Sequence, residues 1–498
     1  MPLVRRWFGN KGAAARKFLF LPNSFLNLKF PSMMVPIKFG TDGWRAIIAQ
    51  EYTVDNVNRV AEGTALWLRQ HKASSVVIGH DCRFGGKLFA ETTARVMGAH
   101  GIKVYLAQGM VSTPMVSLGV VQHGADLGIV ITASHNPPEY NGFKLKSRFG
   151  GPSVPSEVAE VEQLIPDQPR AVLPSLAEME EGGLLSYSDL EEAYFVHVNT
   201  HFDMHALVSA SGSLAYDAMY GAGQNVVRRI LPNAHLIHCE ENPSFMGQAP
   251  EPIHRNLSLL SSTLRQSDKL LVGLANDGDA DRIGMYDEHG NFVDSHHILL
   301  LLLLYLHKHK GMSGKVVVTF SVTNKMRQLA EKYGLEFQQT KIGFKYIAEI
   351  MIHEDVLVGG EESGGLAVKG HIPERDGVWI GLLILEFMAK TGKSLSELIQ
   401  DVYDEIGTFA FERDDLHLSE DKKQSVMKAC SDGVYTAFGT YEIIRTEDLD
   451  GYKFFVSEDA WVMVRPSGTE PVLRVYAEAP DSETARAMLN AAHKTLLA

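Results

Sequence analysis

The sequence predicts an α/β protein with four domains, three α/β units followed by a smaller α+β unit. A chain of 498 residues is too long for one hydrophobic core and predicts about three or four domains. Three times along the chain a buried apolar strand ends in a polar loop, and helical segments separate the strands. The C-terminal part instead has successive strand-like segments and one closing helix, which is typical of an α+β domain.

Composition limits the classes of partner. The chain is 45% hydrophobic and 21% charged, as in ordinary globular proteins. Its net charge of -13 argues against nucleic acid or an anionic membrane as a partner. The three cysteines form neither a metal spacing nor a disulfide framework, which favours a reducing, cytoplasmic location. The apolar run from Ile298 to Leu306 is too short to cross a bilayer and predicts a buried helix.

The N-terminal extension, residues 1–36, differs from the rest of the chain. Residues 1–41 carry seven Lys or Arg residues and no acidic residue. A basic targeting peptide is one interpretation. We favour a start codon placed upstream of the true start at Met33 or Met34, because Pro22 and nearby Asn residues interrupt the apolar core that a targeting signal needs. We expect the extension to be disordered.

The first α/β unit is predicted at 37–183. It opens with a glycine-containing loop that ends at Arg45, and Thr53 is the expected N-cap of its first helix. Strand, helix and strand then alternate as in a βαβ unit, and a Pro- and Glu-rich stretch closes the unit as peripheral helix and linker. The expected elements are a helix over 54–70, a strand over 76–79, a helix over 87–99, and strands over 102–106 and within 125–133.

The remaining units are predicted at 184–291, 292–403 and 404–498. The expected strands lie at 214–217, 235–237, 270–275 and 283–286 in the second unit, 315–319 and 356–358 in the third, and 453–456, 461–464 and 473–476 in the fourth. The expected helices begin near 224, 298, 324, 378 and 482, the last with Asp481 as its N-cap.

A cluster of acidic residues follows the predicted strand 270–275. Asp277, Asp279 and Asp281 are spaced two apart, and on an extended segment this spacing places three carboxylates on one side. They repel each other unless a cation lies between them, and ligation by carboxylates suits Mg²⁺. A calcium-binding EF-hand is disfavoured because Arg282 stands where that loop requires Gly. A solvated acidic turn is the remaining alternative.

Two further loops carry groups that bind oxygen-rich ligands. One follows a predicted strand of the fourth unit and combines a cation, hydroxyls and a glycine, as in a phosphate site. The other places an acid and a hydroxyl between glycines, which suits vicinal sugar hydroxyls. A plain turn explains either loop equally well. The residues are Arg465, Ser467, Gly468 and Thr469 in the first loop, and Glu361 and Ser363 in the second.

Ser134 lies in the polar loop from Thr132 to Lys144, directly after an apolar strand. A hydrolase nucleophile would need a G-x-S-x-G elbow, which is absent. We therefore favour Ser134 as a phosphate carrier whose phosphate lies against the aspartate-bound metal, with Lys144 and Arg282 adding positive charge. A structural serine at a strand end is the alternative.

In combination, these loops resemble those of the α-D-phosphohexomutase superfamily, the phosphoglucomutases and phosphomannomutases. The serine loop reads T-A-S-H-N-P-P-E-Y-N-G-F-K, and the loops D-G-D-A-D-R, G-G-E-E-S-G-G and R-P-S-G-T-E-P follow in the family order. The resemblance runs from about Ile37 to the C-terminus. It implies four domains around a central cleft, with mixed sheets in the first three.

The resemblance implies an isomerase that interconverts hexose 1-phosphate and hexose 6-phosphate, of glucose and/or mannose. Ser134 would give its phosphoryl group to a hexose monophosphate, and the hexose 1,6-bisphosphate formed would return its other phosphoryl group. The implied cofactors are Mg²⁺ and a hexose 1,6-bisphosphate primer. The implied partner is a hexose phosphate substrate, and the protein would be a monomer or homodimer.

The resemblance also implies roles for single residues. Lys144 would be the candidate general acid/base. The implied catalytic residues are Ser134, His135, Lys144, Arg45 and Arg282, the metal ligands Ser134, Asp277, Asp279 and Asp281, the sugar-binding residues Glu361 and Ser363, and the phosphate-binding residues Arg465, Ser467, Gly468 and Thr469.

One position departs from the family pattern. Gly365 stands where some members have His, which leaves open which group acts as acid and base. Gly365 also disfavours the alternative of a phosphoglucosamine mutase, whose loop usually reads G-E-x-S-G-H. Two alternatives belong to other classes, a phosphatase-like hydrolase and a non-catalytic sugar-phosphate-binding protein.

Overall fold

The computed structural model describes residues 36–498 except 41, 171 and 468–471. The expectations for the N-terminal extension, and those for Gly468 and Thr469, lie outside the described residues. Residues 37–498 form one compact unit. One hydrophobic cluster extends through the first three predicted units and includes Val77, Val272 and Leu357, and further clusters lie beside it. The boundaries between the four units therefore stay a prediction.

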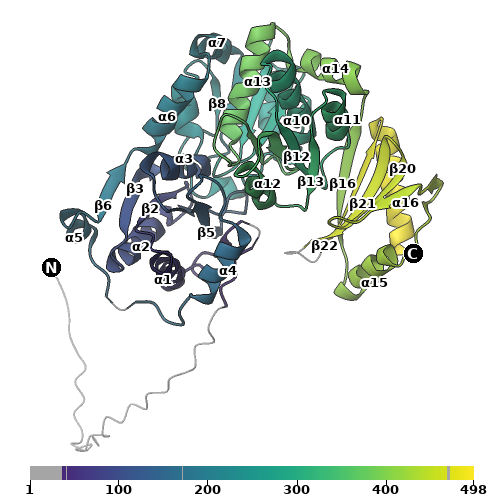
Figure 1. Cartoon of the computed structure of the whole chain (residues 1–498). Coiled ribbons are helices and arrows are strands. Elements are labelled where there is room, and N and C mark those ends of the chain that lie inside the picture. The colour runs from purple at the N-terminus through teal and green to yellow at the C-terminus, as the bar shows by residue number, and fades with distance from the viewer. Residues whose placement is uncertain (1–35, 41, 171, 468–471) are drawn as a thin grey trace, which may run out of the picture. The chain divides into compact units, whose positions relative to one another are not determined.

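The first sheet is mixed, with the strand order β1-β5-β4-β2-β3-β6. Strand β2 pairs in parallel with β3 and β4, whereas β5 is antiparallel to β4 and β1. Thr53 caps α1 as predicted, because its side chain accepts a hydrogen bond from the backbone N–H of Asn56. Helices α1 and α2 pack against each other beside this sheet (Figure 1). The bounds are β1 (Trp44–Ile47), α1 (Val54–Gln70), β2 (Ser75–His80), α2 (Gly86–Ala99), β3 (Lys103–Met110), α3 (Thr113–His123), β4 (Leu127–Ile131), β5 (Tyr140–Ser147), α4 (Pro155–Gln163), α5 (Leu176–Glu181) and β6 (Leu185–Ser188).

Strand β5 corrects one expectation from the sequence. Lys144 does not lie in a polar loop but in this strand, opposite Val130 of β4. The strand is almost wholly buried, and the side chains of Lys144 and Lys146 are 0% exposed. Their carboxylate partners come from other parts of the chain, so the local sequence looked like an exposed loop.

The second and third sheets repeat one local arrangement of the first. In each, a strand that pairs in parallel with its neighbour ends in a loop, and an antiparallel strand returns: β4 to β5, β9 to β10 and β14 to β15. Three of the four predicted functional loops therefore lie at equivalent strand ends. The second unit contains α6 (Leu190–His201), α7 (Met204–Ala210), β7 (Leu214–Asp217), α8 (Gln224–Ile230), β8 (His235–Ile237), α9 (Ser258–Arg265), β9 (Val272–Asn276), β10 (Ile283–Tyr286) and β11 (Phe292–Val293).

The third unit contains the predicted leucine-rich helix, α10, which continues as a π-helical turn over Leu304–His309. Residues Ile298 to Leu306 are at most 2% exposed, as expected for a helix that is apolar on all sides. The sheet order is β13-β12-β14-β15. The bounds are α10 (Ser295–Leu303), β12 (Lys315–Thr319), α11 (Lys325–Lys332), β13 (Phe337–Thr340), α12 (Phe344–Met351), β14 (Val356–Gly360), β15 (Leu366–Val368), α13 (Gly377–Thr391) and α14 (Leu395–Ile406).

The fourth unit is an antiparallel sheet with the order β16-β22-β21-β20-β19, against which α15 and α16 pack (yellow end of Figure 1). The α+β prediction is thus confirmed, including Asp481 as the N-cap of α16. The bounds are β16 (Ala410–His417), α15 (Glu420–Ser431), β17 (Ala437–Phe438), β18 (Tyr441–Glu442), β19 (Arg445–Glu447), β20 (Tyr452–Ser457), β21 (Ala460–Pro466), β22 (Val472–Ala479) and α16 (Ser482–Leu497).

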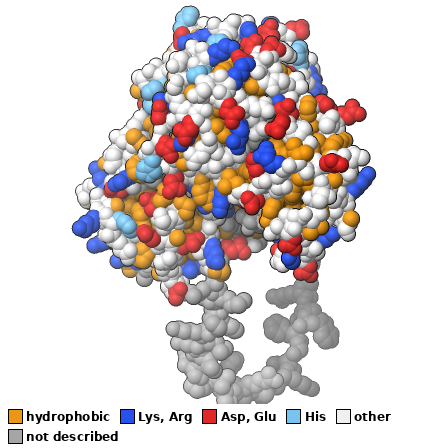
Figure 2. Space-filling view, turned by 45° about the vertical axis from the view of Figure 1, so that its right-hand side comes forward, with side chains coloured by type: hydrophobic (Ala, Val, Ile, Leu, Met, Phe, Trp, Pro, Cys, Tyr) orange, Lys and Arg blue, Asp and Glu red, His pale blue; other side chains and the backbone are white. Residues whose placement is uncertain are grey.

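The surface carries both signs of charge. On the face shown in Figure 2, acidic and basic side chains are interspersed, so the net charge of -13 is not gathered in one block there. Among the helices of the described residues, none combines the length and apolar character needed to span a membrane.

Candidate active site

Ser134 lies three residues beyond the end of β4 and is 1% exposed. Its φ of 53° is rare for a residue other than glycine, and such strain costs on the order of 1 kcal/mol. The Ser134 hydroxyl donates a 2.6 Å hydrogen bond to Oδ2 of Asp277, and its Oγ lies 3.4 Å from Nδ1 of His135. The fold thus brings together the predicted phosphate carrier and the first predicted metal ligand.

The three predicted metal ligands converge directly after β9. Carboxylate oxygens of Asp277, Asp279 and Asp281 lie within 4.8 Å of one another, and all three residues are buried. The segment is not extended, as the spacing had suggested, but turns at Ala280, whose φ is 56°. The turn, rather than strand alternation, places the carboxylates together.

The donor atoms of this cluster fit Mg²⁺. Oδ1 of Asp279 and Oδ1 of Asp281 are buried and have no hydrogen-bond partner among the described residues. Burial and the neighbouring carboxylates of Asp279 and Asp281 raise the pKa of Asp277 well above its ordinary value. Buried carboxylates this close are costly without a cation, and Mg²⁺ takes oxygen ligands of this type.

Lys144 reaches the cluster from β5. Its Nζ lies 2.8 Å from Oδ2 of Asp279, 3.0 Å from Oδ2 of Asp281 and 2.9 Å from Oδ2 of Asp42. Burial alone would lower the pKa of the Lys144 amine, but these three carboxylates outweigh it and raise that pKa above its ordinary value. The amine therefore carries a proton and a positive charge at neutral pH.

Arg45 and Arg282 bring positive charge to the surroundings of Ser134 and His135. Nη1 of Arg45 donates a 2.7 Å hydrogen bond to Oδ1 of Asn136, and the backbone N–H of Arg282 donates to Oδ1 of Asp277. Burial, Arg282 and Arg45 hold the pKa of His135 well below its ordinary value. His135 is therefore neutral at pH 7, and the positive potential that depresses its pKa also favours a bound phosphate.

Sequence reasoning missed Asp42 and Arg375. Nη2 of Arg375 lies 2.7 Å from Oδ2 of Asp281 and also pairs with Asp42. A Cβ placed at Gly365 would lie 2.4 Å from Cδ of Arg375, so this arginine occupies the space that a larger residue at 365 would need. The charged run Glu374-Arg375-Asp376 before an apolar helix was the signal that could have found it.

The two predicted sugar-binding residues differ in burial. Glu361 directly follows β14, is buried and accepts a hydrogen bond of 3.0 Å from the backbone N–H of Gly343. Burial raises the pKa of Glu361, against the opposing effect of Arg375 and Arg282. Ser363 is exposed. The backbone N–H of Ile283 donates to Gly364 O, which joins this loop to the strand that follows the metal loop.

The predicted phosphate-binding residues are described in part. Arg465 lies at the end of β21, and its Nε is 3.3 Å from Oδ1 of Asp450. Oδ2 of the same aspartate accepts a 2.8 Å hydrogen bond from the backbone N–H of Ile342. Ser467 is buried. Asp450 therefore connects the start of the phosphate loop to the loop that contacts Glu361.

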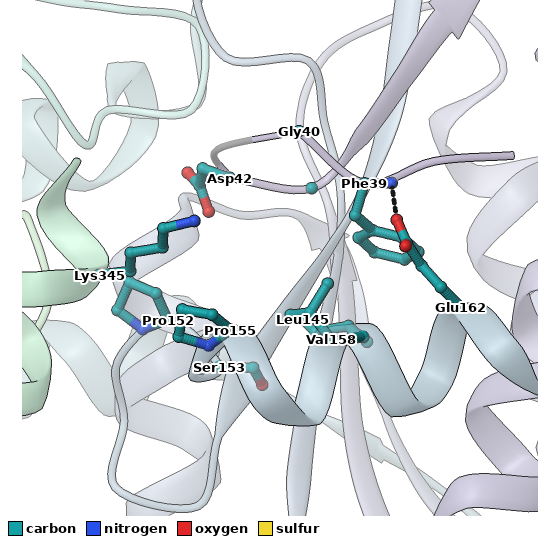
Figure 3. Close-up of a pocket in the computed structure, with 12 residues that line it drawn as sticks. Phe39, Gly40, Asp42, Leu145, Pro152, Ser153, Pro155, Val158, Glu162 and Lys345 are labelled. Atoms are coloured by element: carbon teal, nitrogen blue, oxygen red, sulfur yellow. Dashed lines mark hydrogen bonds between the residues drawn. The ribbon is translucent and has the colours of Figure 1, made fainter. Parts of the chain in front are cut away.

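A pocket of about 150 Å³ lies beside Asp42. Figure 3 shows the Lys345 side chain extending toward Asp42, with apolar side chains such as Leu145 and Val158 on the other side. The backbone N–H of Phe39 donates to Glu162 at its far end. The pocket adjoins the charged cluster, because Asp42 contacts Lys144.

Comparison with known protein families decides the assignment. Four domain families of phosphoglucomutase/phosphomannomutase match the chain in the order expected. They are alpha/beta/alpha domain I at 36–170, alpha/beta/alpha domain II at 192–290, alpha/beta/alpha domain III at 294–406 and the C-terminal domain at 428–493. The chain belongs to the phosphoglucomutase/phosphomannomutase family. It is an isomerase of the phosphohexomutase superfamily, in which a phosphoryl group moves within the substrate.

Individual relatives cover nearly the whole chain. A phosphoglucomutase/phosphomannomutase of Thermococcus kodakarensis is 30% identical over 92% of this chain and 98% of its own length. A phosphoglucosamine mutase of Levilactobacillus brevis is 31% identical over 90% of this chain and 96% of its own. A crystal structure named for a candidate phosphomannomutase of Thermus thermophilus superposes with a TM-score of 0.83 at 36% identity, covering 94% of this chain and 100% of that one.

Proposed function

We propose that this protein is a Mg²⁺-dependent phosphohexomutase that interconverts the 1- and 6-phosphates of glucose and/or mannose through a phosphoserine at Ser134. The observation that carries the proposal is the 2.6 Å hydrogen bond from the Ser134 hydroxyl to Asp277, within a buried cluster of three carboxylates. A reactive hydroxyl beside a cation site is what phosphoryl transfer requires, because charge on the transferring group must be offset.

Different residues of the chain are proposed to bind the metal, carry the phosphoryl group and transfer the proton. When bound by Asp277, Asp279 and Asp281, Mg²⁺ supplies positive charge to the phosphoryl oxygens. The bond between phosphorus and Ser134 Oγ breaks as a bond from phosphorus to a sugar hydroxyl oxygen forms, and the hydroxyl proton leaves to a base. The bisphosphate then returns its other phosphoryl group to Ser134. Lys144 is the candidate general acid that returns a proton to Ser134 Oγ, since its buried amine is protonated at neutral pH.

Binding of the hexose phosphate is assigned to the other loops. Glu361 and Ser363 are proposed to hold the sugar hydroxyls, and Arg465, Ser467, Gly468 and Thr469 the phosphate that does not react. Hexose 1,6-bisphosphate is the proposed primer, because it can transfer a phosphoryl group to unphosphorylated Ser134. Arg45, His135 and Arg282 are proposed to lie at the reacting phosphoryl group.

A phosphoglucosamine mutase is the second candidate, because relatives with that name match the chain as well as those named phosphoglucomutase/phosphomannomutase. Gly365, which departs from the G-E-x-S-G-H loop usual in that subgroup, supports glucose or mannose instead. A coupled assay with the 1-phosphates of glucose, mannose and glucosamine separates the candidates. Turnover of glucosamine 1-phosphate alone would contradict the proposed specificity, and equal turnover by Ser134→Ala would contradict the carrier role.

A further inference from the structure

We propose that Arg83 is a positioning residue for phosphoryl transfer, which holds the reactive loop so that Ser134 Oγ stays aimed at the metal cluster. The inference rests on the proposed function, since it concerns the geometry of the phosphate-carrying serine. Arg83 lies after β2, about 50 residues before the serine, in a segment that none of the predicted functional loops includes.

The Arg83 guanidinium donates to four backbone carbonyls of the serine loop. Nη2 donates to Ser134 O at 2.7 Å and to Asn136 O at 2.6 Å, and Nη1 donates to Pro137 O at 2.8 Å and to Tyr140 O at 3.0 Å. The side chain is 0% exposed. Charged donors make strong hydrogen bonds in such an environment, and the planar guanidinium fixes the relative positions of all four carbonyls.

Asp81 supports the backbone N–H of the same residue, Ser134, through Thr132. Its Oδ1 accepts from the backbone N–H of Arg83 at 2.9 Å, and its Oδ2 accepts from the Thr132 hydroxyl at 2.6 Å. Thr132 Oγ1 in turn accepts from the backbone N–H of Ser134 at 2.8 Å. Both backbone polar groups of Ser134 are thus fixed by buried side chains.

This arrangement explains how Ser134 keeps its unusual backbone conformation. A serine with a φ of 53° relaxes to an ordinary conformation unless its surroundings hold it. Relaxation would rotate the side chain away from Asp277, the residue to which its hydroxyl donates. Arg83 therefore acts on the reaction through Ser134, without itself contacting the sugar or the phosphoryl group.

Phe245 links the second unit to this contact. Cζ of Arg83 lies over the buried Phe245 ring, 5.0 Å from the ring centroid. Phe245 and Met246 have φ values of 47° and 52°, so the segment that presents the ring is itself unusual. The loop with Phe245 thus packs on the arginine that holds the serine loop of the first unit.

Arg95 offers a matched control. It is also an arginine of the first unit whose side chain donates to backbone carbonyls, at Pro174 and Leu173, but these lie outside the serine loop. An Arg83 that only stabilises the fold would lower stability on substitution without slowing transfer by the folded protein. A positioning residue would alter the rate of phosphoryl transfer as well.

The experiment compares the full-length wild type with Arg83→Lys and Arg95→Lys. Each is incubated with Mg²⁺ and hexose 1,6-bisphosphate, and intact mass spectrometry follows phosphorylation of Ser134 with time. We expect Arg83→Lys to slow labelling and to lower kcat by about 10- to 100-fold, with KM within about 3-fold, because misplacing a reacting atom acts on the transfer step. Arg95→Lys should label within about 2-fold of the wild type.

Equal labelling rates of Arg83→Lys and Arg95→Lys would overturn the role of Arg83. A wild type that takes up no phosphoryl group would instead overturn the proposed function, so the two failures are distinct. If Arg83→Lys does not fold, Phe245→Leu serves in its place, since it removes the ring from the guanidinium and keeps an apolar side chain. It should slow labelling by about 3-fold, and unchanged labelling would count against the proposal.

Discussion

At the scale of single residues, the site depends on close approach between two loops from different units. The serine loop and the metal loop meet where Ser134 donates to Asp277, and Gly278 lies against the serine backbone. The motifs named Ser134 and the three aspartates, which the fold brings together. They did not predict Asp42, Arg83 or Arg375, because each of these acts through partners distant in sequence.

Substitution of Gly278 tests whether the metal loop must lie close to the serine loop. A Cβ at Gly278 would lie 2.5 Å from Ser134 O, so Gly278→Ala must push the metal loop away from the serine. We expect kcat to fall by about 100-fold, with a loss of roughly 1–3 kcal/mol in the free energy of unfolding. Gly109→Ala is the matched control, because a Cβ there meets nothing within 4 Å. Steady-state kinetics of both variants checks this, and equal kcat values would contradict it.

Lys144 tests the role of the buried cation. Lys144→Met removes the charge that faces Asp279, Asp281 and Asp42 and keeps much of the side-chain volume. We expect kcat to fall by about 100-fold or more, since both proton transfer and charge stabilisation are lost. Lys146→Met is the comparison, because this equally buried lysine pairs most closely with Glu374. A Lys144→Met enzyme as active as Lys146→Met would refute the assignment.

At the scale of elements, strand and helix positions followed well from the sequence. The helix over Val54–Gln70 and the strand over Lys315–Thr319 lie where hydrophobic periodicity and capping predicted. Strand β5 was missed because its buried lysines mimic a polar loop. The turn at Ala280 was missed because a left-handed residue other than glycine leaves no sequence signal.

Helices α6 and α13 meet through a histidine stack that predicts a pH dependence. Nε2 of His197 lies 3.2 Å from Nδ1 of His371. The His371 ring stacks on the Trp379 ring, with 3.9 Å between the ring centroids. Burial, His371 and His201 lower the pKa of His197 to about 4. The unfolded chain takes up this proton near the ordinary value of 6.5, so His197 lowers stability as the pH falls from 6.5 toward 4.

We therefore expect His197→Gln to lose less stability on acidification than the wild type. The glutamine is neutral at every pH and cannot take up the proton. The measurement is the difference in Tm between about pH 7.5 and about pH 5, recorded for both proteins. An equal drop in Tm would show that His197 is not responsible.

At the scale of the molecule, contacts between the third and fourth units connect the proposed phosphate and sugar loops. Asp450 bridges Arg465 and Ile342, and Nη1 of Arg413 lies 3.0 Å from Oε1 of Glu362. Arrangements of this kind could not be read from the sequence, since they depend on how separate sheets pack. The order of the four units could be read from the sequence, because each unit carries its own loop motif.

Asp450→Ala should weaken binding of the hexose phosphate more than catalysis. It frees Arg465 from its partner and removes the acceptor of the Ile342 N–H. We expect KM to rise by about 3- to 10-fold with kcat within about 2-fold, because the reacting groups lie elsewhere. Asp448→Ala, a change at an exposed acid two residues away, is the control. A fall in kcat at unchanged KM would contradict this account.

Ser134 is the proposed carrier of the phosphoryl group, and the whole mechanism depends on it. The most direct measurement incubates the protein with Mg²⁺ and hexose 1,6-bisphosphate and maps the modified residue by peptide mass spectrometry. We expect one phosphoryl group, located on Ser134, that is lost when hexose 1-phosphate is added and is absent in Ser134→Ala. An unlabelled Ser134, or label that persists in Ser134→Ala, would contradict it.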